Sequence, residues 1–159
     1  MRQVWMIAVL LGWTGVSWAG PNDVVVDKVW VGESVPGQDS ATLELNITTV
    51  AAARLLGISS PVAGKVEIHS MAQHHGKMQA VVVDSLALPP HQTTAFGSHR
   101  LFLIMAGLKK ELNAGETVPV TLEVEYANKR RQTVNATATV KKMALSYKHL
   151  GPGEVHDHR

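Results

Sequence analysis

Alternation of apolar and polar side chains is the strongest signal in this sequence. Residues 41–48 read ATLELNIT and place Leu43, Leu45 and Ile47 on one side and polar side chains on the other. Residues 118–126, VPVTLEVEY, alternate in the same way. A period of two residues is the pattern of a half-buried β-strand, since successive side chains of a strand point to opposite faces. Both segments are therefore predicted to be strands.

Further short segments fit the same reading, and turn-forming Pro and Gly residues separate many of them. These additional predicted strands are residues 24–31, 54–58, 65–71, 78–83, 101–105 and 132–140. The segments 65–71 and 78–83 are expected to pair as a hairpin, with Gly76 in the connection. No segment has a convincing helical period. Many short strands at close spacing predict an all-β fold, either an antiparallel sandwich or a Greek-key barrel.

The two ends of the chain differ from this β-rich middle. Residues 1–19 combine Arg2, an apolar run and small residues before Gly20, which is the pattern of a cleaved signal peptide. The apolar run is short for a membrane span, which needs about 20 residues. The sequence thus predicts a signal peptide at 1–19, one β domain at 20–142 and a flexible, histidine-containing tail at 143–159. An exported, periplasmic protein without stable membrane insertion is expected.

The composition argues against several kinds of site. The chain has no cysteine, so it has neither disulfides nor a thiolate metal site. Loss of Arg2 with the signal peptide leaves 14 Lys and Arg against 13 Asp and Glu. This nearly neutral charge gives no indication of nucleic-acid binding.

The stretch VEIHSMAQHHGKM, residues 66–78, holds three histidines and two methionines. His69 and Met71 are two residues apart on a predicted strand and therefore share a face. His74 and His75 fall in the connection, and Met78 begins the returning strand. Imidazole and thioether ligands suit Cu(I) and not Mg²⁺ or Ca²⁺, which prefer oxygen. Alternatively, the methionines fill gaps in the core and the histidines belong to a polar turn.

Sequence signatures of common enzymes are missing. There is no HExxH, GxSxG, phosphate-binding loop or dinucleotide fingerprint, and the carboxylates are scattered over predicted solvent faces. The protein is expected not to be an enzyme. An oxidative copper enzyme is the weakest alternative, because its copper brace needs an N-terminal histidine and the predicted first mature residue is Gly20.

Three blocks taken together resemble the PCu(A)C family of periplasmic copper chaperones. They are VWVGESVPGQDSATLELNI, LLGISSPVAGKVEIHSM and GLKKELNAGETVPVTLEVE, in that order along the chain. The resemblance implies a cupredoxin-like β-barrel that holds one Cu(I). It also implies a copper-accepting partner, such as subunit II of cytochrome c oxidase or a Sco-type protein.

The resemblance is incomplete at the metal. It places the four ligand positions at His69, Ala80, Phe102 and Ile104, where the family has His, Met, His and Met. Only the first ligand is kept. The predicted replacement site lies on one hairpin, with metal ligands drawn from His69, Met71, His74, His75 and Met78. Secondary candidates are His99, which has the wrong strand parity, and the tail residues His156 and His158.

Two functions remain open. The first is a copper chaperone that delivers or buffers Cu(I), possibly for assembly of the copper site of cytochrome c oxidase, with its site reorganised around His69. The second is a metal-free interaction module in which Phe102 and Ile104 form an apolar patch beside His69.

Overall fold

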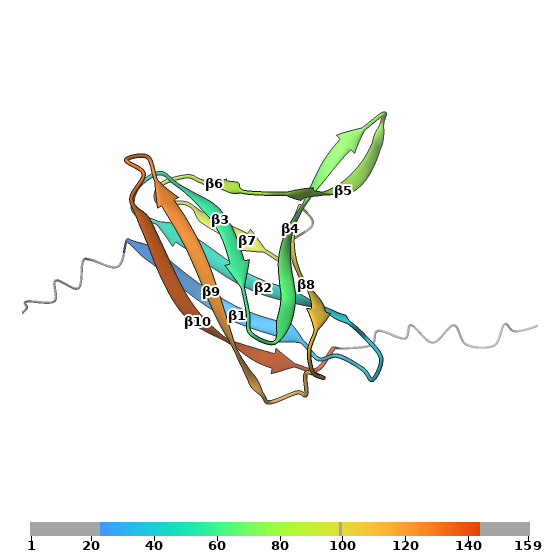
Figure 1. The fold of residues 1–159 in the computed structure, drawn as a ribbon. Helices are drawn as coiled ribbons and strands as arrows, with labels where there is room; N and C mark the ends of the chain where they lie inside the picture. The colour runs from blue at the N-terminus through green and yellow to red at the C-terminus, as the bar shows by residue number, and fades with distance from the viewer. Residues whose placement is uncertain (1–22, 99, 144–159) are drawn as a thin grey trace, which may run out of the picture.

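The computed structural model describes residues 23–98 and 100–143 as ten β-strands (Figure 1). Within these ranges the chain forms no helix long and apolar enough to cross a membrane. The ten strands confirm the all-β prediction. The predicted signal peptide, His99 and the tail from residue 144 lie outside the described residues. The strands are β1 (Val24–Gly32), β2 (Ser40–Thr49), β3 (Ala53–Ser59), β4 (Ala63–His74), β5 (Lys77–Val83), β6 (Leu86–Leu88), β7 (Thr93–Phe96), β8 (Leu101–Leu108), β9 (Thr117–Tyr126) and β10 (Arg131–Lys141).

Hydrogen bonds join the strands in the order β5-β4-β8-β2-β1-β10-β9-β3-β6, with β7 paired to β2. Most neighbours are antiparallel, but β1 and β10 run parallel over residues 30–32 of β1. Through β1 the sheet folds back on itself, so that β10, β9 and β3 face β2 and β8 as a sandwich (Figure 1). The predicted sandwich-like architecture is thus present.

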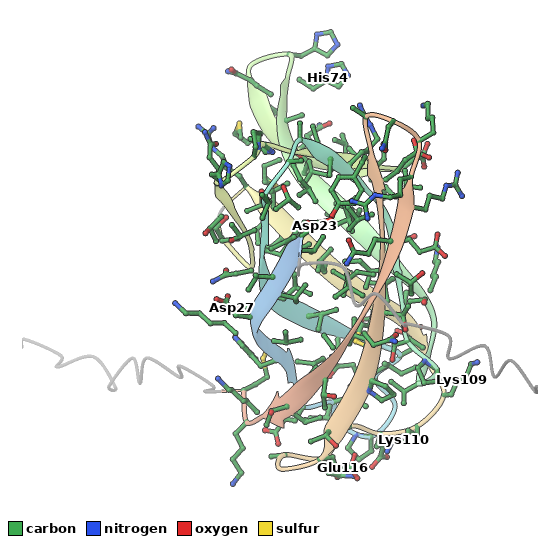
Figure 2. The ribbon with its side chains drawn as sticks, turned by 90° about the vertical axis from the view of Figure 1, so that its left-hand side faces the viewer. Asp23, Asp27, His74, Lys109, Lys110 and Glu116 are labelled. Atoms are coloured by element: carbon green, nitrogen blue, oxygen red, sulfur yellow. The ribbon has the colours of Figure 1, made fainter. Side chains whose placement is uncertain are left out.

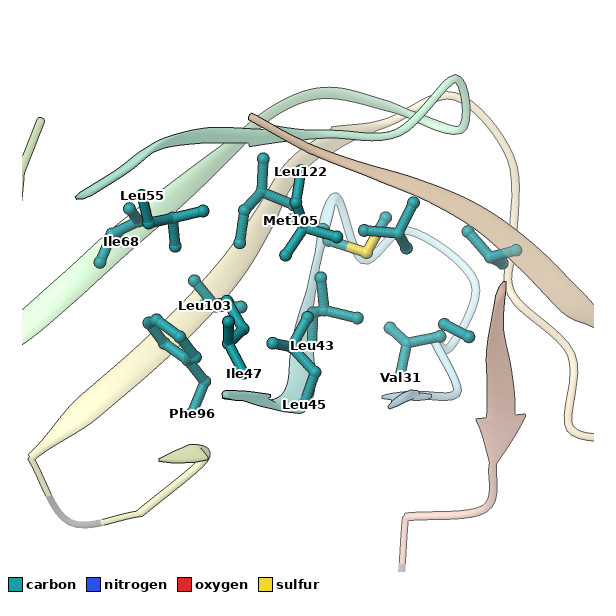
Figure 3. Close-up of a cluster of buried hydrophobic side chains, with 14 of the residues drawn as sticks. Val31, Leu43, Leu45, Ile47, Leu55, Ile68, Phe96, Leu103, Met105 and Leu122 are labelled. Carbon is teal, nitrogen blue, oxygen red and sulfur yellow. The ribbon is translucent and has the colours of Figure 1, made fainter. Parts of the chain in front are cut away.

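The core lies between these two layers (Figure 3). Leu43, Leu45 and Ile47 of β2 are almost fully buried, as their alternation predicts. They meet Leu55 of β3 and Leu122 of β9 from the opposite layer. Each fully buried side chain of this kind contributes roughly 1.5–3 kcal/mol to folding. A chain without disulfides depends on this apolar burial.

Two short strands, β6 and β7, were missed by sequence reasoning. Residues 93–96, TTAF, pair with β2 as β7 and bury Phe96 in the core. The segment is short and follows Pro89 and Pro90, so it carries no alternation long enough to be recognised.

The β4–β5 hairpin sets the geometry of the candidate site. Its two-residue connection is His75-Gly76, with φ values of 47° and 77°. Two successive positive φ values define a type I′ turn, whose twist matches that of paired strands. The first part of β4 pairs with β8 as far as Ser70, whereas beyond it β4 pairs with β5 alone. The end of the hairpin consequently projects from the body of the sandwich (Figure 1).

Candidate functional site

His69 lies in the middle of β4, between two neighbouring strands. Its partner in register on β8 is Phe102, and its partner on β5 is Val82. Directly opposed residues point to the same face of a sheet, so these three side chains are neighbours. The adjacent residue Ile68 and its partner Leu103 are buried. The His69 face is therefore the outer, solvent-facing side of the sheet.

The same register gathers every position at which the resemblance expects a copper ligand. Ala80 lies opposite Met71, and Ile104 lies opposite Glu67. Met71 and Glu67 flank His69 at two residues on either side, so all of these residues share its face. The ligand positions predicted from the PCu(A)C resemblance thus converge on His69, but three of them carry apolar side chains.

The His69 ring is held by a carboxylate. Its Nε2 lies 3.1 Å from Oε2 of Glu67, and 22% of the His69 side chain is exposed. Glu67 also forms an ion pair with Lys65. The hydrogen bond from Lys65, followed by the one from His69, holds the pKa of Glu67 below its ordinary value.

This contact decides which ring nitrogen is available. In a neutral imidazole whose Nε2–H donates to Glu67, the free lone pair is on Nδ1. Metal-binding histidines commonly donate their second nitrogen to a carboxylate in this way, which fixes the tautomer and the ring orientation. Sequence reasoning missed Glu67. The alternation of Lys65, Glu67 and His69 along one strand face was the signal that could have revealed it.

Of the predicted ligands, Met71 lies nearest to His69 along the strand. It is two residues away on the same face and is partly buried. Met78 also shares this face, but it is paired with Gln73 and its side chain is 58% exposed. Gln73 is four residues beyond His69, which corresponds to about 13 Å along a strand. Met78 is therefore a diagonal neighbour of Met71 and lies beyond reach of a metal shared with His69.

The other two predicted ligands occupy the tip of the hairpin. His74 is the last residue of β4, and Figure 2 shows it at the far end of the ribbon. It is five residues from His69, or about 16 Å along the strand. The rings of His74 and His75 stack on each other with centroids 5.1 Å apart. The structure therefore divides the predicted ligands into a pair near the barrel, His69 and Met71, and a separate pair at the tip.

His69 and Met71 can bind only a limited range of metal ions. Among residues 23–98 and 100–143, no three His, Cys, Asp or Glu side chains come together as a metal site. What remains at His69 is one imidazole and one thioether. The carboxylate of Glu67 is already bonded to the ring and to Lys65, and the residues at positions 80, 102 and 104 are apolar. This combination can hold a soft ion at low coordination and offers little to a hard, oxygen-seeking cation.

A hollow on the described surface lies away from this site. It has a volume of about 500 Å³ and opens between β1 and β10, lined mainly by valines with Asp27 and Lys28. Its lining includes neither a histidine nor a methionine, so it adds no metal ligand.

Comparison with known proteins places the chain in a family. Residues 24–140 match the family described as "Putative lipoprotein LpqE-like". The chain belongs to the LpqE-like family. A relative from Leifsonia xyli subsp. xyli, "Putative lipoprotein Lxx21020", is 25% identical over 133 residues, covering 77% of this chain and 80% of the relative.

Solved structures similar to this LpqE-like protein include PCuAC domains. The copper-bound PCuAC domain of PmoF2 superposes with a TM-score of 0.62 at 20% identity, covering 76% of this chain and 94% of that one. Apo-DR1885 from Deinococcus radiodurans gives a TM-score of 0.58 at 24% identity, covering 91% and 95% of the two chains. The similarity extends over most of each domain and confirms the cupredoxin-like PCuAC fold inferred from the sequence blocks.

Proposed function

We propose that this LpqE-like protein is an exported copper-binding protein that holds Cu(I) between His69 and Met71. The observation that carries the proposal is the pairing of His69 with Glu67. It orients the ring and leaves Nδ1 as the free nitrogen, with a thioether two residues away on the same face. The residues present fit a soft ion with two protein ligands. They do not fit the four-ligand site of the resembling family, because Ala80, Phe102 and Ile104 supply no donor.

Such a site would act by ligand exchange and not by catalysis. A two-ligand ion on an outer sheet face stays open to ligands from an acceptor protein. Because imidazole and thioether are neutral, departure of the ion leaves no buried negative charge behind. Copper buffering or delivery follows, with subunit II of cytochrome c oxidase or a Sco-type protein as the proposed kind of acceptor.

The proposed location is the periplasm. Residues 1–19 have the pattern of a signal peptide, and the family and the Leifsonia relative are both described as lipoproteins, a class of exported proteins. The 159 residues include no cysteine to which a thioether-linked lipid could be attached. The proposal therefore rests on export and not on lipid anchoring.

A second candidate is a metal-free interaction module. Val82 and Met78 are 56% and 58% exposed on the same face as Phe102 and Ile104. Neighbouring exposed apolar side chains often mark a contact surface for a partner. In this alternative His69 and Glu67 would be polar members of a docking surface.

Competition titration with Cu(I) and a chromophoric chelator separates the two functions. Four proteins are compared: the unaltered chain, His69→Ala, Met71→Leu and a chain ending at Lys142. Copper binding at the proposed site weakens by at least about tenfold in each substitution, because even loss of an outer partner of a metal ligand costs 10–100-fold. The shortened chain keeps that site. Binding that disappears only with the tail, or no binding in any protein, would favour the interaction module.

A further inference from the structure

The tip of the β4–β5 hairpin carries a pair of histidines. His74 and His75 are consecutive, both are exposed, and their rings lie 5.1 Å apart at an angle of 5°. The end of this hairpin projects from the sandwich (Figure 1), and Figure 2 shows His74 at that end. This pair does not contribute to the His69 site described above.

The turn itself is unusual for a hairpin. The position held by His75 needs a positive φ, which is 47° here, and Asn or Asp is the common residue at this place in a type I′ turn. Histidine tolerates the left-handed region better than most residues do, but it offers no advantage for the turn. The turn therefore explains Gly76 and leaves the choice of His75 unexplained.

Two adjacent imidazoles can bind one metal ion together. Metal–nitrogen bonds are about 2.0 Å long, so the two coordinating nitrogens must approach more closely than the stacked rings do. Exposed side chains change rotamer within nanoseconds, so this adjustment needs no change in the backbone. The peptide bond keeps the two Cα atoms about 3.8 Å apart, and the hairpin turn fixes the backbone dihedral angles.

We propose that His74 and His75 form a second metal site, selective for divalent transition-metal ions with Cu(II) as the best fit. Imidazole nitrogen suits Zn, Cu and Ni, and Cu(II) binds most tightly among the divalent ions of this series. The tip supplies two nitrogens, whereas the site at His69 supplies nitrogen and soft sulfur. One hairpin thus carries one site for each oxidation state of copper, and neither depends on the other.

The charge beside the tip limits its affinity. Lys77 lies opposite His74 in the ladder, and its ammonium group opposes a bound cation. Its side chain is exposed, so solvent screens much of this repulsion. The tip is therefore a site for capture and exchange, and Lys77→Gln is expected to tighten it.

Paramagnetic broadening in NMR spectra tests the proposal in the full chain. Cu(II) is added in substoichiometric amounts, and backbone amide signals are followed residue by residue. The test variant combines His74→Gln with His75→Asn, because Asn keeps the positive φ of the turn. The matched control is His91→Asn, which removes an exposed histidine that also has a positive φ, 57°, but whose neighbours in the sequence are Pro90 and Gln92.

The proposal predicts selective loss of the amide signals of residues 73–78 in the unaltered protein and in His91→Asn. The double variant keeps these signals. Broadening confined to the tail histidines, with a sharp tip, would overturn the proposal. So would tip broadening that survives in the double variant. The experiment detects Cu(II) at the tip and does not measure Cu(I) at His69. A negative result at the tip therefore leaves the proposed His69 site untested and unaffected.

Discussion

The positions around His69 should accept a complete copper site, because the strand register brings them together. The perturbation is the triple variant Ala80→Met, Phe102→His and Ile104→Met, which supplies the ligands that the PCu(A)C resemblance expects. Residue 102 is directly opposite His69, which corresponds to a Cβ separation of about 4.5–5.5 Å. Positions 80 and 104 are diagonal neighbours, at about 7–8 Å between Cα atoms. These spacings allow all four side chains to reach one ion.

The gain in affinity can be bounded. Loss of a residue that only hydrogen-bonds to a metal ligand typically lowers metal affinity about 10–100-fold. Three new direct ligands should therefore raise the affinity by more than the loss of one such residue lowers it. We expect Cu(I) affinity to rise by at least about 100-fold, or roughly 2.7 kcal/mol. The apo variant should be slightly less stable, because Phe102 and Ile104 are half-buried and lose apolar contact.

The assay is competition for Cu(I) with a chelator of known affinity. The matched control replaces Ala80→Met by Gln79→Met, which adds the same thioether one residue away on the opposite face. The control should bind more weakly than the triple variant. Equal affinity in the two proteins, or no gain over the unaltered chain, would show that these positions do not converge on His69.

Other predictions concern stability. Leu43→Ala empties a fully buried position and should lower the free energy of unfolding by about 2–5 kcal/mol in urea denaturation, whereas Val25→Ala, at a position 51% exposed, should have little effect. Gly97→Ala should lower the melting temperature, because φ is +106° and the added Cβ would collide with a neighbouring side chain; Gly57→Ala has open space and should be tolerated in the same assay. Glu67 has a lowered pKa, so its stabilising contribution is present above the ordinary carboxyl pKa of about 4.3 and is lost as pH falls through its lower folded value. As the pH is lowered, the free energy of unfolding should therefore fall less steeply in Glu67→Gln than in the unaltered protein. An unchanged slope would contradict the lowered pKa of Glu67.

Most of the fold was predictable because alternation is a local signal. Leu43, Leu45 and Ile47 are apolar at every second position, and each is buried as expected. The short strand that buries Phe96 is different, since four residues beside prolines form a strand only because β2 offers a partner. Its existence depends on tertiary pairing that the local pattern does not contain.

The candidate site was predictable in its residue types but not in its distances. The sequence identified His69 and Met71 as neighbours on one face, which needs only strand parity. The separation of Met78 from His69 depends on the register, and the two-residue turn at His75 sets that register. The bond between Glu67 and His69 likewise depends on side-chain rotamers that a sequence pattern does not specify.

X-ray absorption at the copper edge of the Cu(I)-loaded full chain tests the central proposal most directly. The account predicts a low-coordinate ion with one imidazole nitrogen and one thioether sulfur among its ligands, and a changed spectrum in both His69→Ala and Met71→Leu. A spectrum without sulfur, or one that neither substitution alters, would contradict it.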